Sequence, residues 1–373
     1  MSASSVAAPR PAPRLGGLPV VLPSWRDPRL KLSAVIIALQ VLGQTELGFK
    51  VSIAQILVTV AACAVVDTAV TLRRQRMLVW PASALLTGNS VAFILRASGT
   101  RHGDWWTLHG IQYFLLAAML ALLSKYLVQI HGRHFFNPSN VGLVWTLLII
   151  GPVHVFPQYL WWGPLGVPVI LALAVIFLGA MWILRSVGMF AMAGTFWITL
   201  AALIGIFALS GRSFIAIWHS GPVAGFAYWR DICLSPELLI FVFFMMSDPK
   251  TTPRTRTGRV IYGAATAVVA AALLFWQPTE FGIKVAILAS LTVVCALVPA
   301  IDAIVRRREA PVTEAPGRER SWRPALSWPA WRSPALVAAV LIAIAAPVDT
   351  VALTANKQIG LIERGLTGTK NAQ

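Results

Sequence analysis

Long apolar segments, each close to the length that crosses a bilayer as a helix, dominate this chain of 373 residues. A transmembrane helix needs about 20 mostly apolar residues. Charged residues make up only 12% of the sequence, against about 25% in soluble domains. We therefore predict an all-α polytopic membrane protein with eleven helices, at about residues 31–48, 51–72, 78–97, 105–127, 136–152, 163–184, 188–210, 233–247, 260–276, 282–304 and 333–353.

The basic residues predict the orientation and the domain layout. With a cytoplasmic N-terminus, 22 of the 31 Lys and Arg residues fall in cytoplasmic segments, as the positive-inside rule requires. Orientation therefore explains the net charge of +17 better than nucleic-acid binding does. We expect five parts: a disordered cytoplasmic tail (1–30), a transmembrane domain (31–305), a basic, Pro-rich cytoplasmic linker (306–332), an additional transmembrane helix (333–353) and a non-cytoplasmic tail (354–373).

The segment SPELLIFVFFMMSDPKTTPRTRTGRVIYG, residues 235–263, combines an apolar run with a polar stop. Asp248 ends the run, Pro249 breaks the helix, and Thr251 is among the hydroxyl residues that can bind the freed backbone groups. An acid at membrane depth is costly and usually functional. The pattern predicts a helix that ends inside the protein; the alternative is a polar turn between two ordinary spans.

The third and eighth predicted spans suggest internal symmetry. WPASALLTGNS (80–90) and SPELLIFVFFMMSDP (235–249) are both short or interrupted, and each is third in a group of five. Two groups with an odd number of helices face opposite ways across the membrane, with broken helices meeting near the midplane. We predict a ten-helix inverted repeat (5+5) with broken helices, plus the extra C-terminal helix. A chance pairing of two interrupted helices is the alternative.

A third polar segment, GRHFFNPSNVG (132–142), precedes the fifth span. Asn137 lies before Pro138, and Asn140 follows about one turn later. The amide groups of Asn offer donors and an acceptor that suit the carbonyl and imide edge of a flavin or a quinone. The alternative is helix capping, because Asn is a preferred N-cap and Pro a preferred first-turn residue.

Two further acids lie within apolar spans, Asp67 in the second and Glu237 in the eighth. Intramembrane acids often mark ion or proton pathways, so Asp67, Glu237 and Asp248 are candidates for such a pathway. Asp67 could instead pair with an interior Arg or a hydroxyl group. No metal site is expected, since the three cysteines are far apart and lack ligand spacing.

The order of three motifs resembles a known family. SALLTGNS (83–90), KYLVQIHGRHFFNPSNVGLVW (125–145) and FFMMSDPKTTPRTRTGRVIYG (243–263) are similar to RnfD of the Rnf electron-transport complexes and to NqrB of the Na⁺-translocating NADH:quinone reductase, the RnfD/NqrB family. The resemblance implies a ten-helix inverted repeat in the bacterial cytoplasmic (inner) membrane that helps to pass electrons across it. The flavin-binding residues that it implies are Ser83, Thr87, Gly88, His134, Asn137, Asn140, Asp248 and Thr251.

Two departures from the family pattern limit what carries over. Relatives with covalent FMN attach it to a Thr in a loop after the fifth helix, but residues 151–162 here (GPVHVFPQYLWW) contain no Ser or Thr. We therefore expect a noncovalent flavin, riboflavin or FMN, and no covalent FMN on this loop. The extra helix after residue 332 is the second departure. Both features suggest a divergent branch that resembles the UnbU-type membrane proteins of enediyne biosynthesis clusters.

Two classes of function remain open from the sequence. The first is a membrane subunit of an electron-transport system that couples electron transfer to transmembrane transport, with other subunits or a redox protein as partners. The second is an inverted-repeat permease for a small metabolite or biosynthetic product, without redox activity. The chain has no nucleotide-binding domain for NADH and no iron–sulfur ligand set. In either class we expect a subunit that depends on partners more than an independent enzyme.

Overall fold

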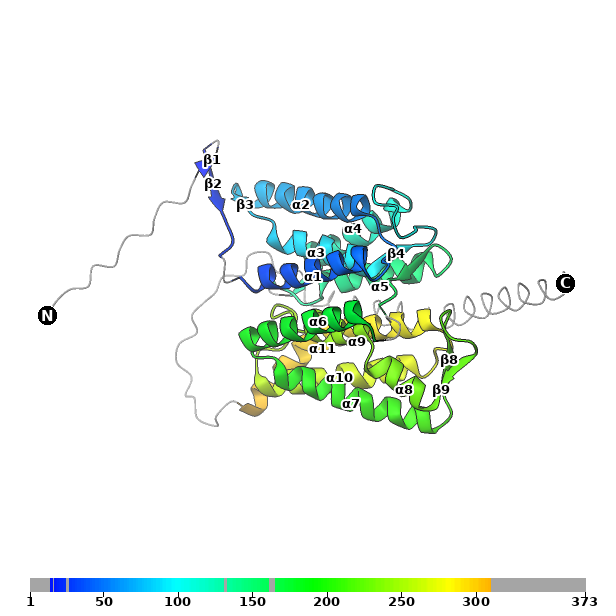
Figure 1. Cartoon of the computed structure of the whole chain (residues 1–373). Helices are drawn as coiled ribbons and strands as arrows, with labels where there is room; N and C mark the ends of the chain where they lie inside the picture. Colours follow the sequence, from blue (N-terminus) through cyan, green and yellow to red (C-terminus); the bar gives the residue numbers. More distant parts are fainter. Residues whose placement is uncertain (1–13, 16, 25–26, 131–132, 161–164, 310–373) are drawn as a thin grey trace.

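The computed structural model describes residues 14–309, apart from residue 16 and residues 25–26, 131–132 and 161–164. Helices dominate this part of the chain (Figure 1). They are α1 (Pro28–Thr45), α2 (Ile53–Gln75), α3 (Ala82–Ile94), α4 (Ile111–Leu127), α5 (Pro138–Ile150), α6 (Val167–Val187), α7 (Phe190–Leu209), α8 (Gly225–Cys233), α9 (Pro236–Ile240), the π-helical turn η1 (Phe241–Met245), α10 (Arg256–Leu274) and α11 (Glu280–Glu309).

Each of the ten spans predicted between residues 31 and 305 coincides with a helix, and the eighth span is α9 continued by η1. Five helices are long and apolar enough to cross a membrane, α2, α6, α7, α10 and the Glu280–Val305 part of α11, while α3, α4 and α5 are shorter apolar helices. The all-α polytopic membrane fold is thus confirmed. The predicted linker (306–332) begins within α11, which continues to Glu309; the rest of the linker and the eleventh helix lie outside the described residues. The short helix α8 was not predicted.

The strands are short and join loops at the ends of the helices. They are β1 (Arg14–Leu15), β2 (Leu18–Val21), β3 (Leu78–Val79), β4 (Leu95–Ala97), β5 (Gln129–Ile130), β6 (Arg133–His134), β7 (Val155–Pro157), β8 (Ser213–Ile215) and β9 (Pro222–Ala224). Strand β1 pairs antiparallel with β2, which pairs parallel with β3. The pairs β4–β7, β5–β6 and β8–β9 are antiparallel. The β4–β7 pair joins the end of α3 to the loop that follows α5.

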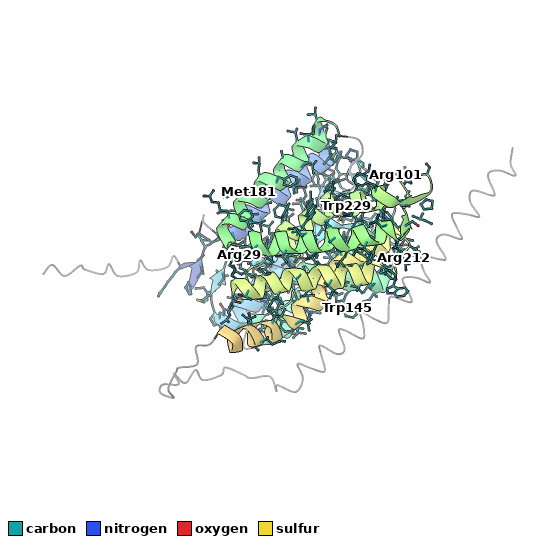
Figure 2. All side chains as sticks on the ribbon, turned by 90° about the horizontal axis from the view of Figure 1, so that it is seen from below. Arg29, Arg101, Trp145, Met181, Arg212 and Trp229 are labelled. Atoms are coloured by element: carbon teal, nitrogen blue, oxygen red, sulfur yellow. The ribbon has the colours of Figure 1, made fainter. Side chains whose placement is uncertain are left out.

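The chain folds into two halves, with α1–α5 above α6–α11 in the view of Figure 1. In the first half α2 packs on α4, and α4 packs on α5; in the second half α7 packs on α10, and α10 packs on α11. The two halves meet where α1 packs on α6 and α5 packs on α11. Side chains fill these contacts throughout, and Figure 2 shows them seen from below, with Arg29 near one end of the helices and Arg212 near the other.

The third helices of the two halves, α3 and α9 with η1, run in opposite directions. Ser83 at the start of α3 and Ser247 just after η1 line the same cavity. Ile94 at the end of α3 and Glu237 at the start of α9 line a second cavity. The third helix of one half is therefore antiparallel to that of the other, as the predicted inverted repeat requires.

A cap residue followed by proline begins three of the helices at the interface between the halves. Asp27, Asn137 and Ser235 each accept a backbone N–H bond of the first turn of α1, α5 and α9, and proline follows at the first helical position. Proline lacks the N–H that would go unpaired there, and its φ angle suits a helix start. The sequence thus sets where these helices begin.

Candidate functional site

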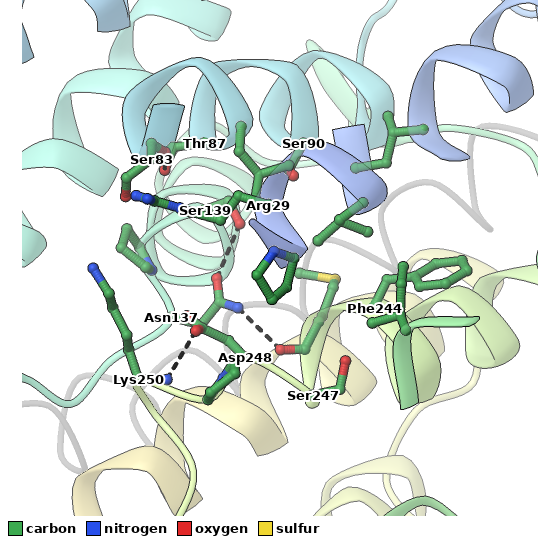
Figure 3. A pocket seen from close by; sticks show the side chains of 18 of the residues that line it. Arg29, Ser83, Thr87, Ser90, Asn137, Ser139, Phe244, Ser247, Asp248 and Lys250 are labelled. Carbon is green, nitrogen blue, oxygen red and sulfur yellow. Dashed lines mark hydrogen bonds between the residues drawn. The ribbon is translucent and has the colours of Figure 1, made fainter. Parts of the chain in front are cut away.

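A cavity of about 540 Å³ lies between the two halves, where helix ends from both halves meet (Figure 3). This volume falls within the roughly 300–1,000 Å³ typical of ligand pockets. The start of α1, the length of α3, the start of α5, the end of α6 and the η1–α10 loop all contribute to its wall. Apolar side chains such as Phe93, Phe244 and Met245 line it together with Ser, Thr, Asn and His side chains.

Five of the predicted flavin-site residues line this cavity: Ser83, Thr87, His134, Asn137 and Asp248. They come from all three motifs, which are separated by up to about half the chain. Their placement brings the motifs together at one site. A flavin there remains a prediction.

Asn137 has a structural role as well as a place in the cavity wall. Its Nδ2 donates to the Met245 carbonyl oxygen over 3.0 Å, which ties α5 to η1 of the other half. Its Oδ1 accepts from Ser139 Oγ at 2.9 Å and from the Asn140 backbone N–H at 3.2 Å (Figure 3). The capping alternative is therefore correct for Asn137. An amide nitrogen carries two hydrogens, so one remains to donate to a ligand.

Thr87 and Ser83 lie one turn apart on α3 and face the cavity beside Ser90 (Figure 3). The Thr87 hydroxyl donates to the Ser83 carbonyl oxygen at 2.8 Å, and its side chain is only 5% exposed. Because the hydroxyl proton is used in this bond to the helix backbone, the remaining lone pairs of the Thr87 hydroxyl oxygen can act as acceptors. This edge of α3 can accept hydrogen bonds from an N–H group of a ligand.

The SDP turn both lines the cavity and stabilises itself. Asp248 Oδ1 accepts from the Lys250 backbone N–H at 2.9 Å, and its carbonyl oxygen accepts from the N–H groups of Thr251 and Thr252. The polar-turn alternative thus describes the local hydrogen bonding. Asp248 also lies in the cavity wall, so it is both a turn residue and a candidate ligand-binding residue.

Three predicted site residues do not line the cavity. Gly88 faces α2, where a Cβ would lie 2.9 Å from the Val60 Cα, so its small size serves helix packing. Asn140 is fully buried and bonds across to α11. The Thr251 hydroxyl, also buried, donates to the Asp248 carbonyl oxygen at 3.4 Å. Sequence spacing could not separate these packing and turn residues from their neighbours in the cavity wall.

A charged group at the mouth of the cavity was missed by the motif analysis. Arg29 pairs with Asp27, with Nη2 and Oδ2 2.5 Å apart, and the hydrogen bond from Arg29 lowers the pKa of Asp27. Desolvation, followed by the charge of Arg29, lowers the pKa of Lys250 on the facing loop. Both Arg29 and Lys250 line the cavity. The Asp–Pro pair at the start of α1 was the available signal, since Asp–Pro also ends the η1 segment.

Asp67 lies elsewhere, near the end of α2. Its Oδ1 accepts from Lys125 Nζ at 2.7 Å and also from the Tyr126 hydroxyl, both on α4. This is the pairing that was left open as the alternative to an ion pathway, with Lys in place of Arg. An acid held in this way links two helices of the first half.

Glu237 lines a second, smaller cavity of about 40 Å³. Its Oε1 lies 2.9 Å from Lys284 Nζ and accepts from the Leu160 backbone N–H at 2.8 Å. Ile94, Ile240 and Met245 line both cavities, so the two spaces share part of an apolar wall. Of the three predicted pathway acids, Asp248 and Glu237 therefore line two neighbouring cavities.

Comparison with known proteins agrees with the motifs. Residues 159–310 match the model of the NQR2, RnfD, RnfE family, a range that includes the third motif. The ion-translocating oxidoreductase complex of Sodalis glossinidius (strain morsitans) has a subunit, designated D, that is 29% identical over 319 residues, which cover 69% of this chain and 86% of the relative. The protein of the same name from Citrobacter koseri is 28% identical over 292 residues, 61% of this chain and 77% of the relative. The resemblance predicted from the three motifs is thus confirmed, and the chain is similar to the NQR2, RnfD, RnfE family.

Proposed function

We propose that this chain is a membrane subunit of an electron-transport system, like RnfD and NqrB, and that it binds a flavin noncovalently in the large cavity. Its relatives carry the name of a subunit of an ion-translocating oxidoreductase complex, which supports this class. In this proposal the chain works in the bacterial cytoplasmic membrane with other electron-transport subunits. It couples the passage of electrons to transport across the bilayer.

The composition of the cavity wall carries the proposal. A flavin ring has apolar faces and a polar edge of carbonyl and N–H groups. The cavity offers Phe93, Phe244 and Met245 for the faces, and Thr87 with the free N–H of Asn137 for the edge. Bound flavin would supply the capacity to accept and release electrons, while the protein supplies position and electrostatics.

Charged residues at the cavity mouth also bear on flavin binding. Arg29 and Lys250 are cationic groups at the cytoplasmic end in the predicted orientation. Asp27 and Asp248 line the same cavity and offset these two charges. Arg29 and Lys250 would therefore act on a bound flavin as hydrogen-bond donors and not as a net positive charge. Pairing of Arg29 with Asp27 fixes the guanidinium at the helix start.

Purification of the full-length chain in mild detergent, followed by visible absorption, tests this proposal. We expect visible absorbance that corresponds to about one flavin per protein molecule. Denaturation should release all of this flavin, because residues 151–162 contain no Ser or Thr to form a phosphoester bond. In-gel flavin fluorescence from denatured protein would contradict the noncovalent mode. Absence of flavin from folded protein would favour the permease alternative.

A pair of isosteric variants places the flavin. Thr87→Val removes a hydroxyl in the cavity wall, and we expect a several-fold loss of bound flavin with little change in melting temperature. Thr266→Val is the matched control, because Thr266 on α10 is also buried and donates to the carbonyl oxygen four residues earlier, but does not line the cavity. Equal flavin retention by the two variants would show that the flavin lies elsewhere.

A further inference from the structure

The small cavity next to the proposed flavin cavity has charged groups in or beside its wall that the proposed flavin site does not use. Lys284 Nζ on α11 lies 2.9 Å from Glu237 Oε1 and 2.8 Å from Glu280 Oε1. The same ammonium group donates to the Gln158 carbonyl oxygen at 3.2 Å. Lys284 and Glu280 are 3% and 2% exposed. Charges buried in this way within a membrane protein are costly and usually serve function.

Two polar atoms in the wall of this cavity have no hydrogen-bond partner in the described part of the chain. They are Glu237 Oε2, an acceptor, and Gln158 Nε2, a donor on a side chain that is only 2% exposed. Both residues line the cavity of about 40 Å³. A water molecule needs about 10–15 Å³ of such space and two or more polar partners. The site therefore suits water that bridges Glu237 to Gln158.

A metal cation fits this arrangement poorly. Hard cations seek about six oxygen ligands, mostly carboxylates and carbonyls. Here the Lys284 ammonium already takes one oxygen of each carboxylate and the Gln158 carbonyl oxygen. Within the described residues, no group of three His, Cys, Asp or Glu side chains could hold a metal ion. Lys284 is in effect a cation that is tethered to the protein.

The remaining charged neighbour is Arg96 on β4. Its guanidinium stacks on the Tyr159 ring at 4.1 Å, and Lys284 Nζ lies 5.0 Å from the centre of the same ring. The groups around the cavity are thus Arg96 from β4, Gln158 after β7, Glu237 from α9, and Glu280 and Lys284 from α11. Two cations and two carboxylates therefore balance in this cluster, and it is the lack of available oxygen ligands that makes it a poor metal site.

We propose that Glu237 is a proton-exchange site served by water in this small cavity, and that Lys284 occupies the place a transported metal cation would need. Protonation forms an O–H bond at Glu237 Oε2, takes the proton from hydronium and leaves water; release reverses the step. This inference extends the proposed function and rests on it for the role of the proton. The proton at Glu237 is then the ion that is coupled to electron transfer.

Infrared spectroscopy of the purified full-length protein tests the proton site. As the pH falls, we expect the C=O band of a buried carboxylic acid to grow and to shift in D₂O. Glu237→Gln should abolish this band. Glu46→Gln, at an exposed glutamate beyond the end of α1, and Glu280→Gln should both retain it. Loss of the band in either of these two variants, or its persistence in Glu237→Gln, would overturn the assignment.

The role of water and of the tethered cation can be tested on the same samples. Gln158→Leu should keep the band but slow its shift into D₂O, because the bridging water loses a donor. Exchange of Na⁺ for K⁺ or choline should leave the pH midpoint and the melting temperature of the wild-type protein unchanged. A melting temperature that depends on Na⁺ in the wild-type protein but not in Glu237→Gln would show a metal-cation site and overturn the proposal.

Flavin absorbance measured on each preparation separates this inference from the proposed function. A titrating Glu237 band in protein without flavin would leave the proton site standing and remove the electron-transport role. Bound flavin in protein without a titrating Glu237 band would support the electron-transport role and reject the proton site.

Discussion

Asn137 and Asn140 begin the same helix, yet their side chains have different roles. Asn137 caps α5 and lines the large cavity, whereas Asn140 is fully buried and donates to the Leu288 carbonyl oxygen at 2.9 Å and to Thr292 Oγ1 at 2.8 Å on α11. Asn140 therefore joins the two halves. The motif FNPSN contains a ligand-site candidate and an interface residue three positions apart.

We predict that Asn140→Ala lowers the free energy of unfolding by about 1–3 kcal/mol, because it removes both side-chain bonds to α11. Denaturant or thermal unfolding in detergent measures this loss. Thr292→Val removes only one of the two bonds and should cost less. Flavin bound per folded protein should not change, and a selective loss of flavin from stable protein would place Asn140 in the binding site.

A second residue-scale prediction concerns Lys250 at the cavity mouth. Its pKa in the folded protein is lowered from the ordinary 10.5, chiefly by desolvation. The unfolded chain therefore binds this proton more tightly, and stability should rise with pH between the lowered pKa and 10.5. Lys250→Met should lose that rise, as measured by melting temperature across alkaline pH. Lys50→Met, at an exposed lysine between α1 and α2, should retain the wild-type profile.

Close helix contacts at glycine shape the elements of both halves. On α5, a Cβ at Gly142 would overlap the Ala117 carbonyl oxygen of α4, and on α10 a Cβ at Gly263 would lie 2.6 Å from the Met192 carbonyl oxygen of α7. Small residues of this kind allow membrane helices to approach closely. The same device thus sets a helix contact in each half.

We expect Gly142→Ala to destabilise the protein by about 1–3 kcal/mol, since backbone of α4 cannot yield to the added methyl group without a shift of the helix. Gly194→Ala is the matched control, because no atom lies within 4 Å of a Cβ there, and it should be neutral or stabilising by up to about 1 kcal/mol. The melting temperatures of the two variants in detergent measure this difference in stability. Equal effects of the two changes would contradict tight α4–α5 packing.

At the scale of elements, the π-helical turn η1 was not foreseen. The apolar run predicted one interrupted helix at 233–247, but α9 contributes only Pro236–Ile240 before the backbone widens into η1. Such turns often occur at functional sites. Here it ends at the Met245 carbonyl oxygen that Asn137 binds, so the widened turn meets the start of α5 beside the cavity.

For the whole molecule, the basic loops predict a cytoplasmic N-terminus, and eleven spans place Gln373 on the opposite side. A C-terminal alkaline phosphatase fusion should then be active, and a C-terminal green fluorescent protein fusion should be dark. The opposite pair of results would mean that residues 333–353 do not cross the membrane. A fusion truncated after residue 310, beyond the tenth span, serves as the control and should give the reverse pattern of the full-length fusions.

The sequence by itself determined the membrane fold, the ten helices between residues 31 and 305 and the starts of several of them. The length of each apolar segment, the charges of the loops and the cap–proline pairs are local features of the sequence. Each acts on the nearby backbone or on its position in the bilayer, without contacts to distant residues. Only the tertiary structure decided which polar residues share a cavity. Gly88, Asn140 and Thr251 differ from Thr87, Asn137 and Asp248 by a few positions, yet the first three face other helices or the turn itself. The pairing of Glu237 with Lys284, 47 positions apart, likewise arises because the starts of α9 and α11, two helices of the second half, lie side by side in the folded chain.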